Sequence, residues 1–381
     1  MARTIVGLND SKSVKRWSGN LAYDVSQQSY FSSRFMGTGP QSGMPIQILT
    51  DLESDAGEMI DYDLVAELRT APIEGEDIQE GKEEGLRFYS DQVYIDQARQ
   101  GVNTGGRMTR KRTLHNLREV AKKKLSDYWA QVFDQQIFMY LSGGRGVNPN
   151  YYFPLGYAGR ANNAFTAPDA NHQLYGIATG STPTSDASIT TQNVFALELI
   201  DRAKSQADAQ GGGGTGIPVL QPCKFNGEET FVCVMNTYQE NDLRTNTQTG
   251  QWLDINKAAT QSTGYSSNLF KGSLGMYRGV ILHSHRNVIR YNNWGAAGNV
   301  WGARALFLGN QAAVIAFGSP GTNMRFDWYE EARDNGDKVV ISTSTIFGVK
   351  KCTFDYSGGL GSSPQDFGVF ALDTATSRQQ A

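Results

Sequence analysis

The chain has 381 residues, and its 35 Lys and Arg against 38 Asp and Glu give a formal net charge of −3. This balance argues against a general nucleic-acid binder, which would be strongly basic, and no apolar run approaches the roughly 18 residues that span a bilayer. Residues 1–20 lack the apolar core of a secretory signal, and the three widely spaced Cys indicate reduced thiols rather than a disulfide framework.

Opposite charges are concentrated in two neighbouring segments. Residues 51–84 hold thirteen Asp or Glu and two Lys or Arg, whereas residues 99–124 hold nine Lys or Arg and one Glu. The segments therefore carry −11 and +8, and the rest of the chain balances at twenty-four of each sign. They can pair within one molecule or between copies. We expect pairing between copies, because complementary patches steer association and fix register, and this polarity favours a self-assembling protein.

Residues 1–50 show no clear hydrophobic period. Aromatic side chains are scattered among polar residues, and a Gly- and Pro-rich stretch follows at 37–45. This pattern predicts an extended arm that finds its apolar contacts on a neighbouring copy, so that deletion of residues 1–35 would leave a foldable subunit. The aromatic residues expected to anchor the arm are Trp17, Tyr30, Phe31 and Phe35.

An acidic finger is predicted next. Residues 61–70 alternate between apolar and charged side chains, which is typical of a half-solvated strand, and residues 86–95 are a second strand-like run. The connection between them is far too long for a tight hairpin turn. A long two-stranded ribbon is the simplest interpretation, and such a ribbon is marginal alone and needs a surface to lie on. Its acidic residues are Glu74, Glu76, Asp77, Glu80, Glu83 and Glu84.

Residues 109–141 have the strongest helical period in the chain, which ends at Gly143. About 33 residues at 1.5 Å each predict a rod of roughly 50 Å with a more deeply buried second half. Three cations in its first turn would oppose the helix dipole by about 0.3–1 kcal/mol per charge, so an anionic partner is expected. Solvent counterions, phosphate and the acidic finger of a neighbour remain open as that partner. The basic face comprises Arg110, Lys111, Arg112, Arg118, Lys122, Lys123 and Lys124.

The second half of the chain predicts mixed α/β structure after an exposed loop insertion. Residues 143–190 contain only four charged residues and no clear period, which favours the insertion. Helices are expected near 194–207 and 238–244, with a Gly-rich link at 211–214. Strands are expected at 230–235, 277–289, 303–317, 338–349 and 367–372.

No arrangement of residues meets the demands of a catalytic site. His283 and His285 stand two apart on one face of an expected strand, but no third zinc ligand has useful spacing, so we interpret them as exposed strand histidines. The run 211–216 lacks the consecutive Lys-Ser or Lys-Thr pair of a phosphate-binding loop, and it does not follow a clear strand. We therefore expect no enzyme, no metal and no cofactor, and a zinc enzyme centred on the two histidines is the weakest alternative.

Several short stretches are specific in their combined order and spacing, and they cover most of the chain outside 143–190. They are Pro45-Ile46-Gln47 with Thr50-Asp51-Leu52, Ile95-Asp96-Gln97 with Arg99, Phe133-Asp134-Gln135 before Leu141-Ser142-Gly143, Asp242-Leu243-Arg244 with Trp252, Ala305-Leu306-Phe307-Leu308-Gly309, and Trp328-Tyr329-Glu330-Glu331 through Gly348-Val349-Lys350-Lys351. With the order of arm, finger, long helix and mixed domain, they resemble the major capsid protein of tailed bacteriophages. The closest resemblance is to the subfamily typified by a podovirus of Escherichia coli.

The resemblance implies an α+β major capsid fold with five regions. They are an N-arm at 1–50, an extended E-loop at 51–98, a P-domain spine helix with a loop insertion at 99–190, an A-domain at 191–322, and return strands of both domains with the C-terminus at 323–381. It also implies hexamers and pentamers of an icosahedral head around double-stranded DNA, reached after folding in the host cytoplasm. Its implied partners are other copies, the portal, scaffold or decorating proteins and packaged DNA, without a membrane, and no cleaved leading segment is expected.

The main alternative is a nucleic-acid-binding protein that uses the basic face at 107–124. It predicts tight and steeply salt-dependent DNA binding by the monomer. It leaves the acidic finger unexplained, because that finger would repel DNA.

Overall fold

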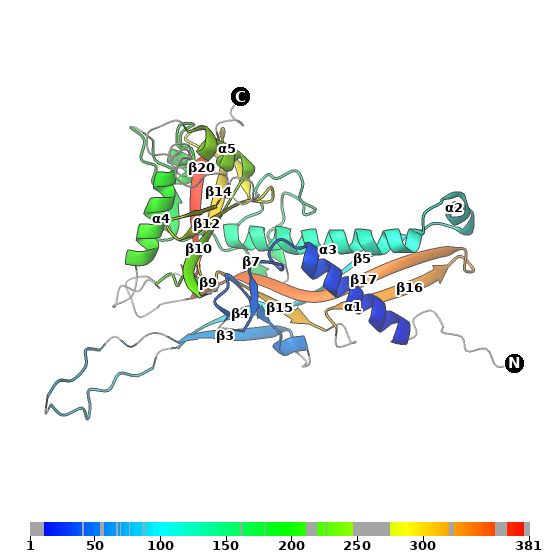
Figure 1. Cartoon of the computed structure of the whole chain (residues 1–381), viewed down its shortest axis with the longest axis horizontal. Helices are drawn as coiled ribbons and strands as arrows, with labels where there is room; N and C mark the ends of the chain where they lie inside the picture. Colours follow the sequence, from blue (N-terminus) through cyan, green and yellow to red (C-terminus); the bar gives the residue numbers. More distant parts are fainter. Residues whose placement is uncertain are drawn as a thin grey trace, which may run out of the picture.

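The computed structural model describes residues 11–39, 42–53, 57–65, 68, 70–75, 77–86, 88–160, 162–178, 180–210, 219–225, 227–246, 275–319, 324–354 and 364–376, without the side chains of residues 11–17 and 19. Two β-sheets and a long helix determine its shape (Figure 1). The Gly-rich link expected at 211–214 lies outside the described residues.

The long strand β17 (Lys338–Lys351) is the centre of a six-stranded sheet. β5 pairs along one edge of β17, whereas β16 and β15 follow each other along its other edge, and β2 and β1 extend the sheet beyond β15. One strand thereby joins distant parts of the chain. The partners are β1 (Met36–Thr38), β2 (Ile46–Leu49), β5 (Asp96–Asn103), β15 (Ala313–Gly318) and β16 (Phe326–Arg333).

The second sheet has eight strands in the order β11-β12-β10-β14-β20-β8, with β13 and β9 added beside β14 and β10. Helices α4 (Leu197–Ala209) and α5 (Thr237–Thr245) pack their apolar side chains on it, where Ile200 and Leu243 are fully buried. The strands are β8 (Gln173–Tyr175), β9 (Cys223–Phe225), β10 (Glu228–Met235), β11 (Gly275–Tyr277), β12 (Val280–Ser284), β13 (Arg290–Trp294), β14 (Val300–Leu308) and β20 (Val369–Ala375).

The long helix is α3 (Leu117–Ser142), and every residue from Val132 to Ser142 is buried. It ends at Gly143, which takes φ 72° and donates its N–H back to the last turn, a conformation that glycine adopts without strain. Its 26 residues span about 39 Å at 1.5 Å per residue. The prediction of a deeply buried second half is confirmed.

The prediction of one continuous helix over 109–141 is wrong at its beginning. A separate short helix, α2 (Arg107–Arg112), is divided from α3 by an extended segment that includes Thr113. Leu114, which the periodic stripe placed on the apolar face, is fully exposed. α2 is held by its own contacts, since Asp337 accepts the backbone N–H of Arg107 and the guanidinium of Arg110, and the β-branched Thr113 between the helices has weak helix propensity.

The predicted finger strands are confirmed with shorter bounds. β3 (Met59–Val65) and β4 (Phe88–Tyr94) pair antiparallel over seven residues each, and a long connection extends beyond them to the end of the molecule (Figure 1). Ile60 and Val93 are buried near the base, whereas Asp61 and Asp63 are exposed. The alternation therefore places one face on the subunit and leaves the other in solvent.

The expectation of an extended arm that docks on a neighbour is wrong. Residues Ser11–Gln28 form helix α1, which packs on α3 and β16 of the same subunit. Leu21, Val25 and Phe31 are buried in the main core. Leu21 and Val25 stand four apart and continue the spacing of Val14 and Trp17 in the sequence, so a helical period was present but was missed against the polar background.

Residues 143–190 are only partly exposed. Some polar side chains in this segment are buried because they bond backbone groups. Arg145 donates to the carbonyls of Phe153 and Asn148, and Asn193, just beyond the segment, donates to the carbonyl of Gly176. β8 adds an edge strand to the eight-stranded sheet by pairing with β20. The expected exposure therefore holds for only part of this segment: Tyr152 and Leu155 are exposed, whereas Tyr151, His172 and Leu174 are buried. The remaining short elements are η2 (Asp51–Glu53), β6 (Gly159–Arg160), β7 (Asn163–Ala164), η3 (Asp186–Ser188), β18 (Thr353–Phe354) and β19 (Gln365–Asp366).

Two long strands expected in the second half are each divided in two. The run 277–289 holds β12 and the end of β11, and the run 303–317 spans β14 and β15, which belong to different sheets. The chain turns between β14 and β15, where Gln311 takes φ 52°. The expected helices 194–207 and 238–244 correspond to α4 and α5, and the other expected strands lie in β10, β17 and β20.

We expect Phe31→Ala to lower the free energy of unfolding of the unassembled subunit by about 3–5 kcal/mol, because the change removes a fully buried ring from the core. Tyr23→Ala on the same helix is the matched control, since Tyr23 is 64% exposed; we expect a change within about 0.5 kcal/mol. Chemical denaturation measures both. Deletion of residues 1–35 should unfold the subunit, and small, equal effects of the two substitutions would contradict the docking of the arm on its own core.

Candidate assembly surfaces

The acidic finger presents carboxylates and apolar side chains to solvent together. Glu84 is half-buried, and its carboxylate accepts the backbone N–H of Thr70 at 2.8 Å, whereas Glu76 lies outside the described residues. The other predicted acidic residues are exposed: Glu74, Asp77, Glu80 and Glu83. Large apolar side chains are exposed beside them: Val65, Leu68, Ile78, Leu86 and Phe88. A two-stranded ribbon with exposed apolar groups is typical of a contact surface.

The expectation of one basic face on one helix is wrong, because several of its cations bond groups of the same subunit. Arg118 forms an ion pair with Glu330 of β16 at 2.7 Å, and Lys122 pairs with Asp24 of α1 at 3.0 Å. Two further cations are also engaged: the guanidinium of Arg110 donates to the Asp337 carbonyl, and Lys124 pairs with Asp127. Lys111, Arg112 and Lys123 are exposed.

The expected conflict with the helix dipole does not occur. Arg110, Lys111 and Arg112 occupy the last turn of α2, where cations meet the negative end of a helix, and the first turn of α3 carries Glu119. The break between the two helices reverses the sign of the interaction. The helix dipole therefore gives no reason to expect an anionic partner for these three cations.

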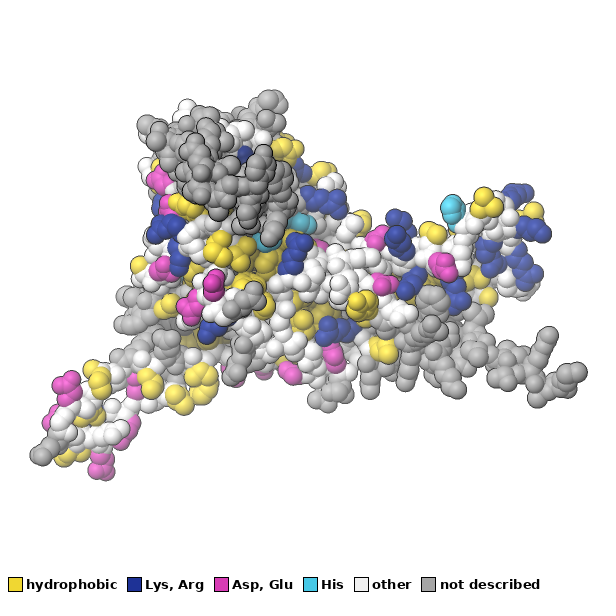
Figure 2. Space-filling view, viewed as in Figure 1, with side chains coloured by type: hydrophobic (Ala, Val, Ile, Leu, Met, Phe, Trp, Pro, Cys, Tyr) yellow, Lys and Arg dark blue, Asp and Glu magenta, His cyan; other side chains and the backbone are white. Residues whose placement is uncertain are grey.

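The acidic finger and the basic end formed by α2 and the start of α3 lie at opposite ends of the subunit. Figure 2 shows acidic side chains at the tip of the finger and a group of Lys and Arg side chains at the far end of the long axis. Figure 1 shows the same separation between the finger and α2. The two charged surfaces therefore cannot meet within one copy.

The predicted arm anchors contact their own subunit, apart from Trp17, whose side chain lies outside the described residues. Phe31 and Phe35 are buried, and the ring of Phe31 packs against Phe138 of α3 at 4.7 Å. Asp134 of α3 fixes the turn after α1, because its carboxylate accepts the Ser29 hydroxyl at 2.8 Å and the backbone N–H of Tyr30 at 2.9 Å. Sequence reasoning gave Asp134 no role, although a lone carboxylate in an apolar half-helix was the available signal.

The two strand histidines are half-buried in an aromatic cluster, so their prediction as exposed residues is wrong. His285 stacks between Tyr30 and Phe138 at centroid distances of 4.5 and 5.1 Å, and His283 packs edge-on against Phe35. Burial, together with the nearby charges of Arg286 and Arg34, lowers the pKa of His285 to about 4. The rings therefore act as neutral packing groups near neutral pH.

Other kinds of site were sought in the described part of the chain. There, no group of three His, Cys, Asp or Glu side chains is arranged to hold a metal ion. Cys223, Cys233 and Cys352 are buried free thiols, and burial raises the pKa of each. No described helix is long and apolar enough to cross a bilayer.

Comparison with known proteins identifies the family of this chain. The family described as phage capsid protein matches residues 5–378. This chain belongs to the phage capsid protein family. It is a structural protein of the phage virion, and its relatives are capsid proteins rather than enzymes.

Individual relatives of this capsid protein agree over nearly the whole chain. The major capsid protein of Pseudomonas phage KPP25 is 28% identical over 398 residues, which cover 96% of each chain. The capsid of Ralstonia phage GP4 is 42% identical with a TM-score of 0.79 and covers 98% of both chains. The capsid of cyanophage Pam1, at 21% identity and a TM-score of 0.68 over 92% of this chain and 93% of that one, shows the fold alone. The nucleic-acid-binding alternative has no support among them.

We expect Asp134 to make the stability of this capsid protein fall as pH rises. Burial raises the pKa of Asp134 from 3.8 to about 6, although bonds from Tyr30, Ser29 and Phe31 oppose the shift. The folded state therefore binds the Asp134 proton more tightly than the unfolded chain does. The resulting stabilisation is fully present below pH 3.8 and is lost as the pH rises through about 6, and the total loss is up to about 3 kcal/mol.

Denaturation of the unassembled subunit across this pH range measures the effect of Asp134. Asp134→Asn does not ionise, so the difference between wild type and variant should shrink as pH rises. Asp127→Asn, on the same helix but half-exposed, is the matched control. A difference between wild type and Asp134→Asn that is constant with pH would contradict the assignment.

Proposed function

We propose that this capsid protein forms the hexamers and pentamers of an icosahedral head that encloses double-stranded DNA. In this arrangement the acidic finger of one copy lies on the basic α2–α3 end of the next. The observation that carries the proposal is the separation of two complementary surfaces to opposite ends of one subunit (Figure 2). Contacts between different surfaces are head-to-tail, and head-to-tail contacts close into rings when the rotation between copies allows it.

Within this proposal the parts of the chain take the names of the tailed-phage major capsid fold. The finger is the E-loop, α3 is the spine helix of the P-domain, and the eight-stranded sheet belongs to the A-domain. The ordered short stretches support membership of the subfamily typified by a podovirus of Escherichia coli as part of this proposal. β8 supports a change in the expected boundaries, since residues 173–175 pair with β20 and so belong with the A-domain.

Apolar contacts and charges have different roles in the proposed interface. An exposed ion pair contributes only about 0–1 kcal/mol, so charges at the finger cannot supply most of the affinity. The exposed side chains of Ile78, Leu86 and Phe88 provide apolar area that a neighbour can bury. The charges steer the encounter and reject the wrong register, because like charges would face each other in it.

The wider proposal includes further partners. A portal, a scaffold or decorating protein, and non-specific contact with packaged DNA belong to the role of a head subunit, as does folding in the host cytoplasm. The near-zero net charge of the chain supports weak rather than tight DNA contact, because the phosphate term scales with the number of cations engaged.

Charge reversal at the basic end tests the proposal. The triple variant Lys111→Glu, Arg112→Glu and Lys123→Glu changes exposed residues and should leave the fold intact while it lowers the yield of closed shells at least tenfold. The reason is that three attractions with the finger become repulsions. Electron microscopy and sedimentation at low and high salt measure assembly, and circular dichroism checks the fold.

Two variants make this test specific. Lys224→Glu with Arg286→Glu reverses exposed cations away from the basic end and should assemble normally. Reversal of the finger with Glu74→Lys, Glu80→Lys and Glu83→Lys should block assembly alone and restore it when combined with the reversed basic end. Normal shells from the basic-end variant, or no rescue by the combination, would rule out charge pairing between these surfaces.

A further inference from the structure

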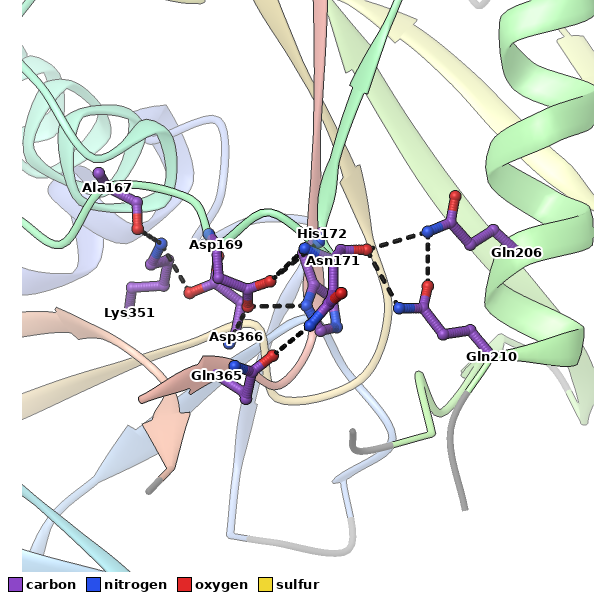
Figure 3. A network of polar contacts seen from close by, with 9 residues as sticks. All are labelled: Ala167, Asp169, Asn171, His172, Gln206, Gln210, Lys351, Gln365 and Asp366. Atoms are coloured by element: carbon purple, nitrogen blue, oxygen red, sulfur yellow. Dashed lines mark hydrogen bonds and ion pairs between the residues drawn. The ribbon is translucent and has the colours of Figure 1, made fainter. Parts of the chain in front are cut away.

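A buried Lys–Asp pair lies where the two sheets meet. Lys351 is the last residue of β17, and Asp366 belongs to the short strand β19 that leads into β20 of the other sheet. The Lys351 amine lies 2.7 Å from a carboxylate oxygen of Asp366, and the two side chains are 1% and 2% exposed (Figure 3). Such burial is unusual for both residue types, because removing two charges from water is costly.

A second carboxylate, Asp169, lies beside this pair. Each aspartate accepts the backbone N–H of the other: Asp366 donates to an Asp169 carboxylate oxygen at 2.8 Å, and Asp169 donates to Asp366 at 3.4 Å. The Asp169 carboxylate also accepts a bond from the buried His172 ring at 2.8 Å (Figure 3). Two carboxyl groups and one amine therefore meet within a few bonds of each other in a water-poor site.

Burial works against the charged form of each of the two paired groups. Burial lowers the pKa of Lys351, against the attraction of Asp366, and burial raises the pKa of Asp366, against the attraction of Lys351. Burial also raises the pKa of Asp169, but bonds from His172 and from backbone N–H groups outweigh it and lower the pKa overall. Asp169 stays ionised, and its negative charge helps to keep Asp366 in the acid form.

We propose that Lys351 and Asp366 join in an intramolecular isopeptide bond. A proton passes from the ammonium to the carboxylate, and the free electron pair of the Lys351 amine attacks the carboxyl carbon of Asp366. The C–N bond forms, the C–OH bond breaks, and the hydroxyl leaves with a proton from the nitrogen as water. The products are one amide and one water, so no other reactant is needed. Asp169 is a positioning residue: its carboxylate accepts the backbone N–H of Asp366, and its negative charge favours the acid form of Asp366.

The proximity of the Lys351 amine and the Asp366 carboxyl group accelerates this reaction. Groups held in contact react with effective concentrations of about 10⁵–10⁸ M, and a desolvated lysine is a good nucleophile. The bond would tie the end of β17 to the strand that enters β20, so the two sheets of one subunit could no longer separate at this point. The inference concerns the single subunit and is independent of how copies pair.

The intact mass of the folded wild-type protein under denaturing conditions tests the proposal. We expect a loss of one water relative to the sequence, and a branched peptide that links Lys351 to Asp366 after protease digestion. Asp366→Asn should instead lose one ammonia, because the amide nitrogen becomes the leaving group. A wild-type mass equal to the sequence would overturn the proposal and leave an ordinary ion pair.

Two matched controls distinguish formation of the isopeptide bond from simple contact between a Lys and an Asp side chain. Lys204 and Asp208 lie 2.6 Å apart, but their side chains are 22% and 54% exposed, so no linked peptide is expected there. Asp169→Asn should slow the loss of water at least tenfold in a time course after refolding, while the folded state still forms. An unchanged rate in Asp169→Asn would remove Asp169 from the proposal, and a linked peptide at Lys204 would show that contact alone is sufficient.

Discussion

The contact between the apolar half of α3 and the central strand β17 supports the rest of the subunit. The Trp129 indole N–H donates to the Thr343 hydroxyl at 2.9 Å, and the Phe133 ring packs edge-on against Phe347 at 4.7 Å. All four side chains are buried, so the helix can occupy only one position on the strand. Because β5, β15 and β16 all pair with β17, this one interface also positions the six-stranded sheet.

The eight-stranded sheet is attached to the C-terminal end of the same helix. Arg304 of β14 donates to the Ser142 carbonyl in the last turn of α3 at 2.9 Å, and it forms a buried ion pair with Asp373 of β20 at 2.7 Å. Burial lowers the pKa of Arg304, but the charge of Asp373 outweighs it and raises the pKa overall, so the arginine stays charged. Buried charges of this kind add little net stability, but removal of one partner would leave the other uncompensated. They therefore fix how the sheet and the helix meet.

Parts of the chain that gain no such support extend from the core and carry the charge asymmetry. The finger exposes Leu68 and Phe88, and the segment between α2 and α3 exposes Leu114; nothing in the described subunit covers these side chains. Exposed apolar groups next to segregated charge are typical of protein–protein contact surfaces. A subunit of this design has a rigid centre and two complementary ends, which is what a closed shell of identical copies requires.

The sequence alone determined the features that depend on local pattern and composition. These were the segregation of charge, the two finger strands with their alternating faces, and the buried second half of α3, since period and charge can be read without knowledge of contacts. The ordered short stretches also identified the family. Tertiary structure decided the rest: α1 packs on its own core, part of residues 143–190 is buried through side chains that bond backbone groups, and the basic residues divide between two helices. In each case the deciding interaction joins residues far apart in sequence, such as Asp134 with Ser29 or Arg118 with Glu330, and no local pattern encodes such a contact.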